Sequence, residues 1–196
     1  MKEYDSFNSK EAYKEHVAPL LKKIKEACTE GKVPFMASFA IASGGKDGKT
    51  EHKRDGLTPA AVKMNPKECR VYSLISIVSG SKAVPAAEVP ELEPKTGSGK
   101  PFESYDSTEA YNETVVPLIS SAAALCNEHR IPFFAIFAVK ADLDSTQYER
   151  YALSAAELGL ELKGSELTSL MAVSDGYRAV PASELPEIEF DANLTA

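Results

Sequence analysis

The sequence contains two similar halves, and this internal repeat constrains the fold more than any other feature. Residues 11–41 agree with the residues 98 positions later at 14 of 31 sites. Residues 73–93 agree with those 96 positions later at 11 of 21 sites. Sequences of ordinary composition agree by chance at roughly one site in fifteen. We therefore predict a tandem duplication with a two-residue gap between Ala42 and Thr50.

The repeat also predicts the domain organisation. We expect one copy in residues 1–93, a linker in residues 94–103 and a second copy in residues 104–196. The linker is rich in glycine, proline, serine and lysine, a composition typical of a flexible connector. Its Gly-Ser-Gly-Lys sequence does not fit a nucleotide-binding loop, because Pro94 and Pro101 occupy the positions that require a glycine and a hydroxyl residue.

Each copy has the pattern of an α+β unit, with a helix, two strands, a second helix and an extended tail. A unit of about 85 residues is marginal alone, because it buries only about 60% of its unfolded surface. We therefore expect a tandem duplication of a helix-strand-strand-helix unit, with the two copies packed as a pseudo-twofold pair that shares a sheet or a helical interface.

The first helix of each copy has a candidate N-cap, Asn8 or Asp106, followed three residues later by a glutamate. Apolar residues then recur at helical spacing. Pro19 and Pro117 lie inside these patterns. Because proline lacks a backbone donor and clashes with the preceding turn, we expect a kink or a break there.

The strands and the second helix are indicated by different signals. Residues 33–42 and 131–140 are apolar at consecutive positions, which is typical of central strands covered on both faces. The more polar residues 49–55 and 147–153 favour edge strands. The second helices have candidate N-caps and glycine terminators, namely Asn65 and Gly80 in copy one and Ser165 and Gly176 in copy two.

The cysteines and the N-terminus favour a cytoplasmic protein with reduced thiols, because three cysteines cannot all pair and no secretory signal is evident. No apolar segment reaches the length of about 18 residues that a membrane span needs. Cys28 and Cys126 recur on the apolar helix face, which indicates core thiols, and an inert role is also favoured for Cys69. No spacing fits a zinc or calcium site, so we expect no metal and no cofactor.

Histidines are the first candidates for acid–base chemistry near neutral pH. His16, His52 and His129 all correspond to other residue types in the opposite copy. Surface or capping roles are therefore favoured over catalysis, although a diverged enzyme can keep its site in one copy only. No catalytic constellation is recognisable, and we assign no catalytic residue.

A cation follows the second helix in each copy, Lys82 in one and Arg178 in the other. The simpler interpretation is local, since a cation complements the carbonyl end of a helix. The alternative is a paired recognition loop, in which Tyr177 stacks on an anionic group and Arg178 forks toward it. Together with Tyr148, these three residues are our candidate ligand-binding or partner-binding residues.

The copies differ most in charge. Residues 1–98 hold 16 Lys+Arg and 13 Asp+Glu, whereas residues 99–196 hold 6 and 16. The first helix is lysine-rich at residues 22–27 but small and uncharged at residues 120–125. This contrast is either neutral surface change or a sign that the uncharged face packs against copy one or a partner. The acidic net charge of −7 argues against nucleic acid.

These features favour a non-catalytic binding or regulatory module that presents a composite surface of both copies to a protein partner. The alternative is a small-molecule binder or an enzyme with its site in the cleft between the copies, a common place for a ligand pocket. A deep pocket there, lined by His52, Tyr148, Tyr151 or Arg178, would favour this alternative.

Overall fold

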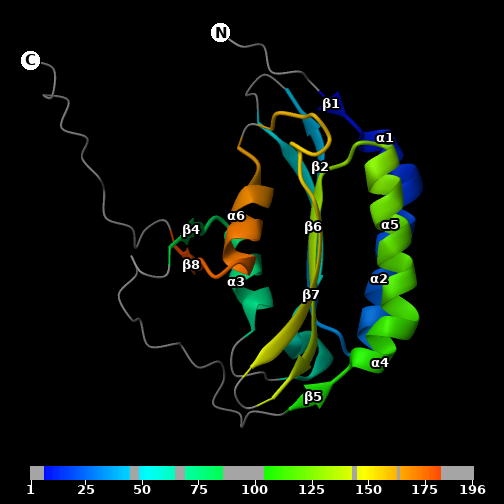
Figure 1. Cartoon of the computed structure of the whole chain (residues 1–196), viewed down its shortest axis with the longest axis vertical. Coiled ribbons are helices and arrows are strands. Elements are labelled where there is room, and N and C mark those ends of the chain that lie inside the picture. Colours follow the sequence, from blue (N-terminus) through cyan, green and yellow to red (C-terminus); the bar gives the residue numbers. More distant parts are fainter. Residues whose placement is uncertain are drawn as a thin grey trace, which may run out of the picture.

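The protein has a mixed α+β fold, described by a computed structural model over residues 7–44, 49–64, 69–85, 104–142, 145–162 and 164–181. A central antiparallel sheet lies between two helical layers, and a short two-stranded ribbon lies outside one of them (Figure 1). Within the described part of the chain, no helix is both long and apolar enough to cross a membrane. The predicted linker, residues 94–103, lies outside the described residues.

Apart from the 3-10 turn η2, which is described only in the first half, the elements follow the same order in both halves. The helices are α1 (Lys10–Ala12), α2 (Ala18–Glu30), α3 (Arg70–Val78), α4 (Thr108–Ala110), α5 (Val116–Glu128) and α6 (Glu166–Ser174), with π-helical turns η1 (Tyr13–Val17) and η4 (Tyr111–Val115) and a 3-10 turn η2 (Pro59–Val62). The strands are β1 (Phe7–Asn8), β2 (Phe35–Ser43), β3 (Glu51–Leu57), β4 (Lys82–Val84), β5 (Tyr105–Asp106), β6 (Phe133–Ala141), β7 (Thr146–Leu153) and β8 (Arg178–Val180).

The two halves share one sheet through β2 and β6, which pair antiparallel at its centre. Ala37 pairs with Ala135, the residue 98 positions later, so this pairing places equivalent residues opposite each other. Two reciprocal backbone bonds flank the pairing, from Ala40 N to Pro132 O (2.9 Å) and from Ala138 N to Pro34 O (2.8 Å). The register is therefore the same when read from either half.

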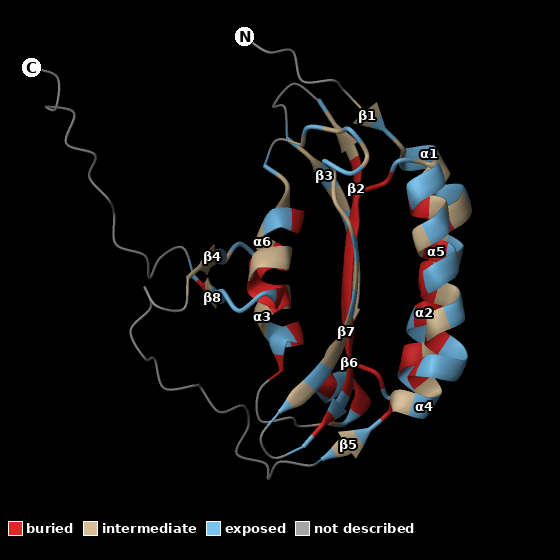
Figure 2. Cartoon of the chain, viewed as in Figure 1, coloured by how far each residue is buried: buried red, intermediate tan, exposed pale blue. Residues whose placement is uncertain are grey.

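The central strands are buried on both faces, as their consecutive apolar residues predict (Figure 2). Side chains alternate across a strand. Phe35 and Phe39 consequently contact the layer of α2 and α5, whereas Met36 contacts the layer of α3 and α6. The polar strands β3 and β7 each pair with one central strand, which agrees with the predicted edge positions.

The first helices begin one residue later than predicted. Asn8 and Asp106 are extended in β1 and β5, and Ser9 and Ser107 occupy the N-cap positions without a side-chain cap bond. The predicted capping residues still serve the helix start, because Asn8 Oδ1 accepts a hydrogen bond from the Lys10 amide at 3.2 Å. Their pairing with the central strands holds them extended and shifts the cap by one position.

The proline in each first helix causes a π turn, where we predicted a kink or a break. In the first half, the Ala18 amide donates to the carbonyl of Tyr13, five residues earlier, immediately before Pro19. The second half has the same turn between Tyr111 and Val116. A wider turn makes room for the proline ring, and the helical course continues through it (Figure 1).

The second helices end at glycines, as predicted, since Gly80 and Gly176 both have a φ near the left-handed region (109° and 110°). Ser165 caps α6 by accepting a hydrogen bond from the Leu167 amide. The predicted cap Asn65 lies outside the described residues, and Cys69 occupies the N-cap position of α3.

The uncharged stretch of α5, residues 120–125, packs only partly against the first half of the chain. Ala122 is buried against the core, as is its counterpart Ile24 in α2. Ser120, Ser121 and Ala124 are exposed. Packing against α2 therefore explains only part of the charge contrast, and contact of this face with a partner stays a prediction.

Candidate functional site

Each second helix begins over the edge strand of the opposite half, and this crossing creates two polar clusters. The β3 cluster consists of Ser38 on β2, His52 and Arg54 on β3, and Ser165 and Glu166 at the start of α6. The equivalent β7 cluster consists of Ile136, Tyr148, Arg150, Cys69 and Arg70, at the start of α3. Side chains of the two halves therefore meet in both clusters.

Glu166 is the centre of the β3 cluster, and only 12% of its side chain is exposed. Its Oε1 atom accepts hydrogen bonds from Ser38 Oγ at 2.6 Å and from Arg54 Nε at 2.7 Å, and Arg54 also pairs with Oε2. Burial raises the pKa of the Glu166 carboxyl, but the bonds from Arg54 and Ser38 outweigh it, so this pKa lies below its ordinary value. Glu166 is therefore a carboxylate at neutral pH.

His52 and Ser165 form the second contact of the β3 cluster. His52 Nε2 lies 3.2 Å from Ser165 Oγ, and both residues are half-buried. Burial lowers the pKa of His52 below its ordinary value, with a further lowering by the charge of Arg54 and opposing effects of Glu166 and of a hydrogen bond with the Thr50 backbone. The imidazole is therefore neutral at pH 7.

The β7 cluster makes the same crossing with different chemistry. The Arg70 amide donates to the Tyr148 hydroxyl at 2.9 Å, and the Arg70 guanidinium lies 5.7 Å from the centre of the Tyr148 ring. The Tyr148 hydroxyl is also hydrogen-bonded to Cys69. Burial raises the pKa of Cys69 to about 11 and that of Tyr148 to about 12, so both groups keep their protons at neutral pH.

Arg70 occupies the position equivalent to Glu166. Arg150, the counterpart of Arg54, therefore finds its partners at the other end of α6. Arg150 donates to Ser174 Oγ at 2.7 Å and pairs with Asp175 at the end of α6. Arg70 itself donates to the carbonyl oxygen of Ser174. Both cations thus serve the carboxyl end of α6, where the helix dipole favours positive charge.

The predicted binding residues Lys82, Tyr177 and Arg178 gather at the β4–β8 ribbon, which has one strand from each half. Lys82 pairs with Val180 and Arg178 with Val84, so the two cations lie on one face as diagonal neighbours. Lys82, Arg178 and Tyr177 are exposed, and among the described residues neither cation has an acidic partner. The other face of the ribbon, with Ala83 and Ala179, packs on the core beneath it.

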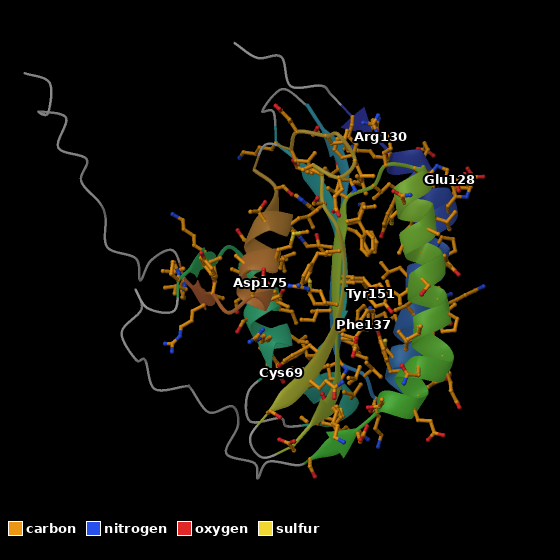
Figure 3. All side chains as sticks on the ribbon, in the orientation of Figure 1. Cys69, Glu128, Arg130, Phe137, Tyr151 and Asp175 are labelled. Atoms are coloured by element: carbon orange, nitrogen blue, oxygen red, sulfur yellow. The ribbon has the colours of Figure 1, made fainter. Side chains whose placement is uncertain are left out.

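Tyr148, the fourth predicted residue, lies in the β7 cluster. Tyr151 lies on the opposite face of the sheet, where it contacts Phe137 edge-on with ring centres 6.2 Å apart (Figure 3). The Tyr111 hydroxyl lies 3.4 Å from that of Tyr151. Because the sheet separates Tyr148 from Tyr151, these two candidate residues cannot line the same cleft.

Sequence analysis missed two associations between the halves. His16 and His129 stack with ring centres 4.6 Å apart and planes 2° from parallel. The His52–Ser165 contact was also missed, because the strand and the helix are 113 residues apart in sequence. One available signal was that His52 and Ser165 align with Tyr148 and Cys69, another pair able to share a hydrogen bond.

The thiols are poor nucleophiles. Cys28 and Cys126 are fully buried, and burial raises the pKa of both, to about 12 for Cys126. The described segments contain no group of three or more histidine, cysteine, aspartate or glutamate side chains that could hold a metal ion.

Comparison with known proteins finds no matching family model, no matching curated protein and no matching solved structure. The β4–β8 ribbon and the two clusters are therefore the candidate functional features of the chain.

Proposed function

We propose that the chain is a duplicated binding or regulatory module, with copies in residues 1–93 and 104–196, that presents a composite surface to a protein partner. The equivalent register at Ala37 and Ala135, the matching π turns and the repeated crossing of the second helices support duplication. The crossing also supports a composite surface, because the start of each second helix contacts the opposite half.

The observation that carries this proposal is the β4–β8 ribbon. It brings the exposed side chains of Lys82 from one half and Arg178 from the other to one face of the ribbon, and the exposed Tyr177 directly precedes Arg178 in sequence. Cations without an acidic neighbour in the described structure favour an anionic contact, and an exposed tyrosine adds apolar area with a polar end. The partner that fits this face is a protein with an acidic segment.

Charge reversal on the ribbon tests the proposal. The full chain carrying Lys82→Glu and Arg178→Glu is compared with one carrying Lys22→Glu and Lys23→Glu, which changes the net charge equally on exposed α2 positions. Affinity capture from native lysate should recover a partner with the wild type and the α2 variant but not with the ribbon variant. Equal recovery by all three chains would exclude the ribbon as the contact surface.

A second candidate function is a small-molecule site or catalytic centre between the halves. The specific observation in its favour is the contact of His52 with Ser165, which joins residues of the two halves. A thermal-shift screen of the full chain with metabolites separates the two candidates, because a ligand of the folded state raises the unfolding temperature. A cytoplasmic location remains a prediction from the cysteine content.

A further inference from the structure

We propose that Ser165 and His52 form a nucleophile–base pair that hydrolyses carboxylic esters. This activity goes beyond partner binding and uses a place other than the β4–β8 ribbon. The pair has the arrangement that nucleophilic catalysis requires, namely a hydroxyl within hydrogen-bond reach of a base that a third group orients.

The contacts of the His52 imidazole suit the role of a general base. Nε2 faces Ser165 Oγ at 3.2 Å, and the ring is also hydrogen-bonded to the backbone of Thr50. An imidazole has two nitrogens, and the proposed reaction uses the tautomer that carries its proton on Nδ1 and keeps the lone pair of Nε2 for the serine hydroxyl. His52 is neutral at pH 7 because burial lowers its pKa, and a neutral imidazole is the form that accepts a proton.

The residue before Ser165 is exposed and has open space beside it. The preceding residue, Gly164, has a φ of +63°, and a Cβ atom built there would meet nothing within 4 Å. Ser165 stands at the N-cap of the nine-residue helix α6, whose first-turn amides lack acceptors within the helix. The Leu167 amide donates to Ser165 Oγ itself. In the proposed reaction, the other amides of this turn donate to the oxygen that becomes negative when a carbonyl is attacked.

The neighbouring carboxylate does not oppose that negative charge. Glu166 is bound on both oxygens by Arg54 and on Oε1 by Ser38, so its charge is compensated on the sheet side of the helix. This compensation also fixes the start of α6 against β2 and β3, and it thereby holds Ser165 beside His52.

The reaction proceeds in two balanced steps. Ser165 Oγ bonds to the carbonyl carbon while its proton passes to His52 Nε2, and the ester C–O bond then breaks as the leaving alcohol takes that proton. Water attacks the acyl-serine and gives a proton to His52, which returns it to Ser165 as the carboxylic acid leaves. Only water is consumed besides the ester, and all groups return to their starting state.

The β7 cluster provides a matched internal control. Cys69 and Tyr148 occupy the positions of Ser165 and His52, but their pKa values of about 11 and about 12 leave neither a thiolate nor a base near neutral pH. Removing the Cys69 thiol perturbs the same structural position without affecting the proposed chemistry.

The test uses the full chain with p-nitrophenyl acetate as the ester and a fluorophosphonate as the serine-directed label. Ser165→Asn removes the nucleophile but keeps an N-cap acceptor, so that α6 keeps its start. We expect this variant and His52→Gln each to lose at least about 100-fold in kcat/KM, which is the size of a general-base contribution. Cys69→Ala should retain the wild-type rate, and thermal melts of all variants identify any loss of folding.

Two readouts decide the outcome. Peptide mapping should place the fluorophosphonate on Ser165 in the wild type and in Cys69→Ala, and kcat/KM should fall only below pH 6.5, where His52 becomes protonated. A label at any other residue, or equal rates for the wild type and folded Ser165→Asn, would overturn the proposal and leave the pair as a helix cap. Because Lys82 and Arg178 are not involved, loss of this activity is distinguishable from loss of partner binding.

Discussion

The β3 and β7 clusters occupy equivalent places in the two halves, but they join helix to strand through different side chains. In both, the start of a second helix is attached to the edge strand of the opposite half. The β3 cluster uses a carboxylate that a guanidinium and a buried hydroxyl satisfy. The β7 cluster uses a tyrosine hydroxyl that accepts from a helix amide, and the buried Ile136 takes the position of the buried hydroxyl.

This contrast shows which features the fold requires. The attachment of helix to strand recurs, whereas the charges do not, since Glu166 corresponds to Arg70 and Ser38 to Ile136. A buried carboxylate needs partners, and Ser38 and Arg54 supply them. Arg70 is exposed, so water can solvate its charge, and its guanidinium donates to the carbonyl oxygen of Ser174 at the end of α6. The polar set of the β3 cluster is therefore more than the fold needs, which is why we look for function there.

The largest effect is expected where a polar group of one cluster is moved into the other. Ile136→Ser leaves a cavity at a site 2% exposed. The new hydroxyl stands at the position equivalent to Ser38, but the β7 cluster has Arg70 where the partner of Ser38, Glu166, stands in the β3 cluster. The free energy of unfolding should fall by about 3–4 kcal/mol in urea titrations. A loss below about 1 kcal/mol would mean that the β7 cluster can satisfy a buried hydroxyl, and the two clusters would then be less different than their side chains indicate.

The second-largest difference in unfolding free energy is expected when the charged residue at each helix start is replaced by glutamine. Glu166→Gln leaves Arg54 without its carboxylate, and because Arg54 is 45% exposed, the loss is expected to be about 2 kcal/mol, less than for a fully buried pair. Arg70→Gln removes an exposed cation and should cost less than about 1 kcal/mol. Equal losses in urea titrations would contradict the distinction between a required carboxylate and a dispensable arginine.

The tyrosine bond of the β7 cluster should contribute less than the carboxylate of the β3 cluster. Tyr148→Phe keeps the ring under Arg70 but removes the acceptor of the Arg70 amide. We expect a loss of about 1 kcal/mol, the net value of one hydrogen bond. Hydrogen exchange at the start of α3 should accelerate while exchange at the start of α6 does not. Equal acceleration at both helix starts would show that the two attachments are not independent.

The comparison also explains what sequence analysis could predict. The α+β class, the central and edge strands, the cap at Ser165 and the terminal glycines follow from local signals, namely apolar periodicity, hydroxyl caps and glycine. The π turns before Pro19 and Pro117 could not be distinguished from kinks, because a proline indicates a missing bond but not which wider turn replaces it.

The clusters were beyond sequence analysis for a different reason. His52 and Ser165 are brought together by the crossing of α6 onto the opposite half, and no local pattern encodes which half a helix covers. Ser38 was a usable signal, since it carries a hydroxyl in an otherwise apolar central strand. The residue aligned with it in the other half is Ile136. A polar residue in a doubly covered strand requires a buried partner, and here that partner is Glu166.

The smallest expected effect is an acid sensitivity confined to the β3 cluster. Because burial holds the pKa of His52 below 6.5, the unfolded chain binds a proton at a higher pH than the folded chain does. The stabilisation by neutral His52 is therefore complete above pH 6.5 and is lost as the pH falls toward the folded pKa. Tyr148, the equivalent residue, has a pKa of about 12 and does not titrate in this range.

This sensitivity is measured as the change in unfolding free energy between about pH 7.5 and about pH 5.5, for the wild type and for His52→Gln. We expect a smaller change in the variant, because it lacks the group that must be charged on unfolding. His16 and His129 are present in both chains, so their contributions cancel in the difference. Glu166 adds its own acid loss only below pH 4.5, outside this interval. An identical change in both chains would place the acid sensitivity elsewhere and remove this distinction between the two clusters.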